Sequence, residues 1–226
     1  MDGTGGSRCG DADHAAVREL SAGERRRARW FFNLVAPAFH VIDRRLLPEY
    51  RAALDAMALD PALDVLDLAT GTGTLALAFS ERGHRVAGID FAERLLRRAR
   101  RRLPGAEMRR ADLVELPALP GASHGIVAMG YLLHGLAPAM RRFVLCEAAR
   151  IARRWVVVFD YARPGPWTVR IVEWIEGPHY PSFVGRPFEA HAAEAGLEVA
   201  ASGGTSDVGG WWLLERRGNG KEDRDG

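Results

Sequence analysis

Residues 63–74 read LDVLDLATGTGT, and residues 84–90, after a short helical run, read HRVAGID. The nearly continuous apolar residues of Leu63–Leu68 predict a parallel strand that is buried on both faces. Two glycines then open a helix predicted over Thr74–Arg82, and a second strand follows over Arg85–Ile89. A strand, a glycine turn, a helix and a second strand that ends in an acid make half of a nucleotide-binding unit.

Outward from this unit, strands and helices keep alternating along the chain. Apolar periodicity and Pro-Gly breaks mark their limits. The predicted elements are helices over Ala92–Leu103 and Pro138–Ala152 and strands over Ala106–Arg110, Gly125–Met129 and Trp155–Phe159. This alternation predicts an α/β fold, a Rossmann-like doubly wound sheet of mostly parallel strands with helices on both faces.

The segments before and after this alternation are predicted to pack on the same sheet. Apolar residues at helical spacing predict an N-terminal helical lid over 23–58, at the mouth of the ligand site. A partly irregular helical region is expected over Trp167–Gly196. The last predicted element is an antiparallel C-terminal hairpin over Leu197–Glu215.

The composition supports a single domain, which we expect over 23–217, between a disordered flank at 1–22 and a charged tail at 218–226. Lys plus Arg (31) nearly balances Asp plus Glu (29), so we expect no nucleic-acid partner. Lys221 is the only lysine, and two cysteines make no disulfide framework. No run approaches the roughly 18 apolar residues of a membrane span, and a cytoplasmic protein is expected.

The carboxyl ends of the first two strands carry the candidate ligand site. Gly71 and Gly73 let a ligand approach the backbone, and Asp90 is placed to accept hydrogen bonds from both ribose hydroxyls. The segment Gly71–Ala76 also satisfies the G-x-G-x-x-G/A pattern of dinucleotide-binding proteins, with Asp90 19 residues after Gly71. Two cofactors, NAD(P) and S-adenosylmethionine, therefore fit this outline.

Asp67, just before the glycines, distinguishes between the two cofactors. Its carboxylate would repel a dinucleotide pyrophosphate, whereas the sulfonium and amino group of S-adenosylmethionine are positive. A core without lysine also lacks the Tyr-x-x-x-Lys pair of single-domain dehydrogenases. S-adenosylmethionine is therefore favoured, and an NAD(P)-binding oxidoreductase remains the alternative.

Four motifs in register carry a family resemblance. LDLATGTG (66–73) resembles the first motif of the class I S-adenosylmethionine-dependent methyltransferases, and the similarity continues through GIDF (88–91), ADL (111–113) and MGYLLH (129–134). It covers roughly residues 58–162. The resemblance implies a sheet of about seven strands with an antiparallel C-terminal hairpin strand.

The resemblance also implies which residues hold the cofactor. Gly71 and Gly73 would line its methionine part, Asp90 would bind the ribose, and Asp112 would bind the exocyclic amine of the adenine. The full set of cofactor-binding residues is Asp67, Ala69, Gly71, Thr72, Gly73, Asp90, Phe91, Asp112, Leu113, Met129, Gly130 and Tyr131. No metal site is expected.

The segment before the first motif is similar to that of the ubiquinone and menaquinone biosynthesis C-methyltransferases. The similar residues are Phe32–Pro37, Asp43–Arg45 and Tyr50-Arg51. Where many relatives begin the fourth strand with Phe-Asp, this chain has His124-Gly125. That departure is a hint of a further alternative, a catalytically silent methyltransferase-like binding module.

Methyl transfer is an in-line displacement, so the protein mainly has to hold the nucleophile and the methyl group aligned. Removal of a proton from the acceptor would need a base, for which His134, Tyr131 and His179 are the catalytic candidates. The Arg-rich helix Arg94–Arg102 is expected to be a solvated face.

Aromatic residues flank the predicted core on both sides, where a lid would be built. They are Trp30, Phe31, Trp167, Trp174, Tyr180 and Phe183. If part of this set lines a cavity, the methyl acceptor is a small apolar or aromatic molecule.

Overall fold

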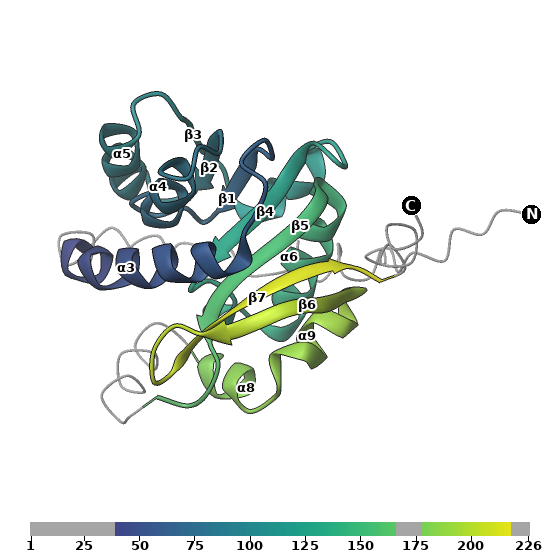
Figure 1. Ribbon diagram of the computed structural model, residues 1–226. Helices are drawn as coiled ribbons and strands as arrows, with labels where there is room; N and C mark the ends of the chain where they lie inside the picture. Colours follow the sequence, from purple (N-terminus) through teal and green to yellow (C-terminus); the bar gives the residue numbers. More distant parts are fainter. Residues whose placement is uncertain (1–38, 166–177, 218–226) are drawn as a thin grey trace, which may run out of the picture.

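The structure, a computed structural model, describes residues 39–165 and 178–217, which contain one sheet with helices on both faces (Figure 1). Its strands are β1 (Val65–Leu68), β2 (Val86–Asp90), β3 (Glu107–Arg110), β4 (His124–Gly130), β5 (Ala152–Tyr161), β6 (Leu197–Gly204) and β7 (Gly209–Arg216). Its α-helices are α3 (Phe39–Met57), α4 (Thr74–Ser80), α5 (Glu93–Arg102), α6 (Pro138–Ile151), α8 (Tyr180–Val184) and α9 (Phe188–Glu194). Two short 3₁₀ turns, η2 (Leu113–Ala118) and η3 (Leu133–Gly135), follow β3 and β4.

The seven strands lie in the order β3-β2-β1-β4-β5-β7-β6. β1 pairs in parallel with β2 and β4, β2 with β3, and β4 with β5. β7 runs antiparallel to both of its neighbours, β5 and β6. The chain moves outward from β1 in one direction and returns to its other side at β4, so the carboxyl end of β1 is the switch point where such sheets bind ligands. The predicted fold is confirmed.

Alternate side chains of the central strands enter two hydrophobic cores, one on each face of the sheet. Val65 and Ile126 pack with residues of α3, α4 and α5. Leu66 and Val127 pack with residues of α6 and α9. Because both faces are covered, these strands are apolar at successive positions rather than alternating.

α3 is one continuous helix with Pro48 inside it. Its residues Tyr50, Leu54 and Met57 are buried, and α3 packs against α4. This packing holds the helix together across the position where proline removes an amide donor. The lid prediction over 23–58 is described only from Phe39 onward.

Several predicted boundaries differ from the structure, and two of the differences have a clear local cause. β1 begins at Val65 rather than Leu63, because the Leu63 amide donates to the Asp60 carbonyl in a turn, at 3.0 Å. The described part of the predicted helical region over 167–196 holds two short helices, and Pro187, with φ −58°, is the residue just before the second. Proline has no amide to extend the preceding helix, which ends before it.

Several predictions lie outside the described residues. These are the flank over 1–22, the tail over 218–226, and the aromatic residues Trp30, Phe31, Trp167 and Trp174. Among the helices that are described, none has the length and apolar character needed to cross a membrane.

Gly125 lies near the amino end of β4, at the end of the sheet opposite the switch point. A Cβ on Gly125 would lie 2.8 Å from Leu63 Cβ, and its amide donates to Asp64 Oδ1 at 2.9 Å. The glycine is therefore explained by close packing. The catalytically silent module stays an alternative prediction.

Candidate functional site

The turn after β1 places three residues in the left-handed backbone region, Ala69 (φ 54°), Gly71 (φ 54°) and Gly73 (φ 77°). For Ala69 this conformation costs about 1–2 kcal/mol. The Gly71 amide donates to Asp90 Oδ2 at 2.8 Å, and a Cβ on Gly71 would meet only the Ala69 carbonyl, at 3.9 Å. Open space beside a strained turn is what a ligand that approaches the backbone requires.

Gly73 has a different role from Gly71. A Cβ on Gly73 would lie 3.1 Å from Ala99 Cβ, so this glycine lets the turn pack closely on α5. Thr72 beside it is buried. Of the predicted turn residues, Ala69 and Gly71 are partly exposed, so a ligand could contact them. Thr72 and Gly73 are buried and support the turn from inside the protein.

Two buried carboxyl groups flank the turn. Asp67 is 1% exposed and accepts a hydrogen bond from Thr70 Oγ1 at 2.6 Å, and burial raises its pKa to about 7. Asp90 accepts the amides of Gly71 and Ala92, and burial raises its pKa to about 6. A cation placed beside these groups would favour their ionised forms. The turn therefore suits a positively charged ligand.

Asp112 begins η2 after the carboxyl end of β3. Its Oδ1 accepts the Val114 amide at 3.3 Å, and Glu115 Oε1 accepts the Asp112 amide at 3.0 Å. This capping box fixes the carboxylate while leaving acceptor capacity on its second oxygen. Leu113, the residue after Asp112, and Phe91, just after β2, are both half-buried, as a contact surface for a flat ring would be.

The three predicted residues at the end of β4 lie in different environments. The Met129 side chain is fully buried in the core. A Cβ on Gly130 would lie 2.6 Å from the Tyr50 hydroxyl, so α3 covers this glycine. Tyr131 has φ 51°, donates its amide to the Phe159 carbonyl at 2.7 Å and is half-buried. Of the three, Tyr131 has the side chain that a ligand could reach.

His134 forms a buried pair with Asp160 at the carboxyl ends of β4 and β5. His134 Nδ1 lies 2.7 Å from Asp160 Oδ1, and the two residues are 4% and 0% exposed. Asp160 Oδ2 also accepts the amides of Leu133 and His134, at 2.8 and 3.3 Å. These amides hold the carboxylate in place, and the carboxylate in turn orients the imidazole.

Aromatic rings surround His134. Tyr161 lies edge-on at 4.9 Å between ring centroids, Tyr180 at 6.3 Å, Tyr131 at 6.4 Å and Phe183 at 6.5 Å. His179 immediately precedes α8 and is half-buried, but it is the next residue, Tyr180, that contacts His134. The structure therefore brings Tyr131 and His134 together, while the role of His179 stays a prediction.

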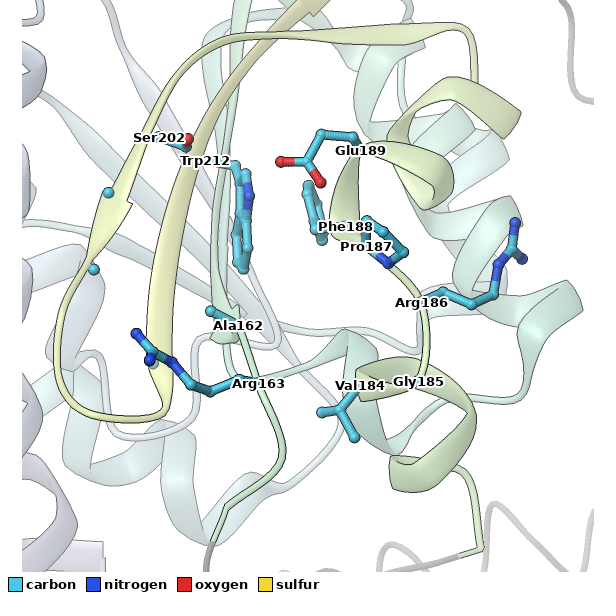
Figure 2. A pocket seen from close by; sticks show the side chains of 13 residues that line it. Ala162, Arg163, Val184, Gly185, Arg186, Pro187, Phe188, Glu189, Ser202 and Trp212 are labelled. Atoms are coloured by element: carbon cyan, nitrogen blue, oxygen red, sulfur yellow. The ribbon is translucent and has the colours of Figure 1, made fainter.

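A groove of about 560 Å³ lies beside the end of β5, between the α8–α9 segment and the β6–β7 hairpin (Figure 2). Phe188 and Trp212 form an aromatic stack in it, with ring centroids 4.1 Å apart. Gly209 links the groove to the end of β4, because a Cβ there would lie 2.7 Å from the Tyr131 hydroxyl. The groove therefore has a mixed lining, in which two aromatic rings lie among charged residues such as Arg163 and Glu189, and it begins next to Tyr131.

Sequence reasoning did not include Asp160 or Asp43 among the site residues. Asp160 lies at the end of a predicted strand, as Asp67 and Asp90 do. This position is the feature of the sequence that could have identified it as a site residue. Asp43 lies on α3 and contacts the glycine turn through side chains. No local pattern could have shown a contact across 29 residues of chain.

The comparisons with known proteins agree with this geometry. Residues 65–154 match the family described as Methyltransferase domain. A demethylmenaquinone methyltransferase of Beutenbergia cavernae is 34% identical over 52% of this chain and 48% of its own length. One of Thermus thermophilus is 38% identical over 50% of this chain and 63% of its own length. This chain therefore matches about half to just under two thirds of the length of these relatives.

Solved structures show the same fold. The magnesium protoporphyrin IX methyltransferase of Synechocystis PCC 6803 with bound SAH superposes with a TM-score of 0.57 at 17% identity, over 77% of this chain and 84% of that one. These matches confirm the family predicted from the motifs and favour it over the NAD(P)-binding alternative. The sequence match over residues 65–154, the strand order and the acids at the strand ends together support a class I S-adenosylmethionine-dependent methyltransferase domain that is similar to the demethylmenaquinone methyltransferases.

Proposed function

We propose that this protein transfers a methyl group from S-adenosylmethionine to a hydroxylated acceptor that is small and apolar or aromatic. The observation that carries the proposal is the buried His134–Asp160 pair at the carboxyl ends of β4 and β5, beside Tyr131. An ordered base is needed where the acceptor must lose a proton before or during methylation.

The residues around the glycine turn fit the cofactor. Gly71 offers open backbone, Asp67 and Asp90 offer buried carboxyls that a cation would keep ionised, and Asp112 offers a capped carboxylate for the adenine amine. Bound S-adenosylmethionine supplies a methyl group on a positively charged sulfur, so no covalent intermediate with the protein is needed. The work left to the chain is alignment and proton removal.

His134 is the proposed base. Asp160 accepts from Nδ1–H, so the lone pair of the imidazole is on Nε2, which takes the proton of the acceptor hydroxyl. Burial raises the pKa of Tyr131 to about 12, so its phenol stays protonated near neutral pH. Tyr131 is accordingly proposed as a pocket wall and hydrogen-bond donor rather than a base.

The groove supports an aromatic acceptor. Phe188 and Trp212 stack on each other in one wall of the groove, and Gly209 places the groove next to Tyr131 at the end of β4. Two of the similar proteins are named demethylmenaquinone methyltransferases, and this name includes a quinone as the compound that they methylate. A hydroquinone or phenol ring seated in the groove is therefore the proposed acceptor class.

The first test measures cofactor binding by isothermal titration with S-adenosylhomocysteine (SAH). We expect binding in the micromolar range for the wild type and its loss in Asp90→Ala, since Asp90 holds both the turn and the proposed ribose site. A wild-type protein that binds no SAH would contradict the proposal.

The second test measures transfer of labelled methyl from S-adenosylmethionine to a soluble naphthoquinol and to simple phenols. His134→Gln should lower kcat by roughly 100-fold or more, the usual contribution of a general base, with SAH affinity unchanged. Asp160→Asn should lower kcat and shift its pH profile, because the imidazole loses its orienting charge.

His191→Gln is the matched control, because His191 is also buried and stacks on Phe183, with ring centroids 5.3 Å apart. It should keep the wild-type kcat. The kcat of His179→Ala shows whether His179, the other histidine candidate, contributes to catalysis. Full activity of His134→Gln on an acceptor that the wild type methylates would sink the assignment of the base.

A further inference from the structure

Asp43 of α3 is joined to the glycine turn by a network of side-chain hydrogen bonds. This network is separate from the contacts proposed for the cofactor. Its Oδ1 accepts hydrogen bonds from the hydroxyls of Thr72 and Thr74, each at 2.6 Å. Its Oδ2 accepts from Arg102 at the end of α5, at 3.0 Å, and Arg102 also donates to Thr74 Oγ1 at 2.6 Å. Three separate elements therefore meet at one carboxylate that is 8% exposed.

The two threonines flank Gly73, whose left-handed conformation shapes the turn. The backbone of the turn is already tied to β2, through the Thr70 amide on the Ile89 carbonyl and the Gly71 amide on Asp90. Those bonds hold the first half of the turn. The bonds from Asp43 add side-chain support to its second half, where the Gly73 amide donates to the Thr70 carbonyl at 2.8 Å and Gly73 packs on α5.

The hydrogen-bond donors around position 43, one of them a positively charged arginine, favour a carboxylate there over a neutral side chain. Hydrogen bonds to an ionised acceptor are shorter and stronger than those between neutral groups, as the two 2.6 Å contacts indicate. Arg102 supplies the opposite charge that a buried carboxylate needs. An alanine would leave both the hydroxyls and the guanidinium without their acceptor.

The same helix reaches the end of β4, because the Tyr50 hydroxyl lies against Gly130. α3 thus contacts the glycine turn through Asp43 and the end of β4 through Tyr50. We propose that Asp43 is a positioning residue of the cofactor site, which acts through Thr72 and Thr74 to hold the glycine turn in its binding conformation and to couple it to α3. This inference rests on the proposed function for the identity of the cofactor.

The test compares Asp43→Ala with Asp55→Ala. Asp55 lies on the same helix, but its side chain is 71% exposed and pairs with Arg82, away from the turn. Asp43→Ala should weaken SAH binding about tenfold and speed hydrogen exchange of amides 71–76, because the turn loses two charge-assisted bonds. Asp55→Ala should leave both quantities within about twofold of wild type.

Thr74→Val gives a milder variant that keeps the branched shape and removes one hydroxyl. Its effect on SAH affinity should be smaller than that of Asp43→Ala, and the double variant should be no weaker than Asp43→Ala alone. Additive effects, equal losses in Asp43→Ala and Asp55→Ala, or unchanged exchange at 71–76 would each overturn the inference. If the wild type bound no SAH, the proposed function would fail, while hydrogen exchange would still decide whether Asp43 holds the turn.

Discussion

Asp67 shows how burial alone can set the charge of a site residue. Burial is the largest influence on its pKa, and the hydrogen bond from Thr70 opposes it only in part. A carboxyl at this position is therefore neutral in much of the cofactor-free protein near neutral pH. A cation in the site would shift it to the ionised form, so cofactor binding should release a proton.

The raised pKa of Asp67 predicts a pH dependence of stability. The folded-state pKa of Asp67, about 7, lies above the ordinary aspartate pKa of 3.8, so its contribution to stability is present at low pH and is lost as pH rises from about 4 to about 7. The loss should have a slope of about 1.4 kcal/mol per pH unit in the cofactor-free protein. Asp67→Asn should remove this component, as measured by urea unfolding across that range.

Glu81 supplies a control of opposite sign. The hydrogen bond from Arg51 lowers its pKa, so the stabilisation from Glu81 is lost as pH falls through its folded-state pKa. Glu81→Gln should leave the decline near neutral pH in place. An Asp67→Asn protein with the wild-type slope would show that this carboxyl is ionised in the folded state.

At the scale of elements, the glycine turn is positioned by what packs behind it. Gly73 lies against Ala99 of α5, and Ala99 is fully buried. α5 was expected to present a solvated arginine face, yet two of its arginines bond into the fold. Arg100 donates to the Met108 carbonyl, and Arg102 donates to Asp43. The helix therefore supports the site as well as covering the sheet.

Gly73→Ala should destabilise the protein more than Gly83→Ala. Both positions have positive φ, 77° and 88°, so each alanine carries a conformational cost of about 1–2 kcal/mol. Only at Gly73 does the new Cβ approach another backbone closely, because the nearest atom to a Cβ on Gly83 is Pro61 Cβ, at 3.7 Å.

The added cost at Gly73 is expected to be about 1–3 kcal/mol, measured by chemical unfolding. Ala99→Gly in the Gly73→Ala background removes the opposing methyl group and should recover part of this cost. If the two single variants were equally stable, the packing of the turn on α5 would not matter.

At the scale of the whole molecule, one sheet joins two hydrophobic cores. Phe79 is buried in the core formed with α3, α4 and α5, and Phe188 in the core formed with α6 and α9. The central strands contribute alternate side chains to both. The described residues should therefore unfold as one cooperative unit.

Phe79→Leu and Phe188→Leu test this expectation, because each is a small change on a different face. Each should cost about 1 kcal/mol, and the double variant should show the sum within about 0.5 kcal/mol. Far-ultraviolet and near-ultraviolet circular dichroism should report one coincident transition for all three. Two separate transitions would mean that the faces fold independently.

The sequence by itself determined the fold and pointed to the candidate residues of the cofactor site. Buried parallel strands require continuous apolar runs, and glycines and acids at strand ends are local signals, so Asp67, Gly71 and Asp90 could be found by position alone. The different roles of Gly71 and Gly73 could not, since one faces open space and the other faces a helix distant in the chain.

Only the tertiary structure decided which side chains meet. His134 and Asp160 are 26 residues apart in the chain, and Asp43 and Thr72 are 29 apart, yet both pairs are in hydrogen-bond contact. The first pair forms because β4 and β5 are parallel neighbours, so their carboxyl ends lie together. The second forms because α3 packs on α4, beside the glycine turn. Strand order and helix packing depend on how much apolar surface is buried over the whole molecule. A short stretch of sequence does not contain that information.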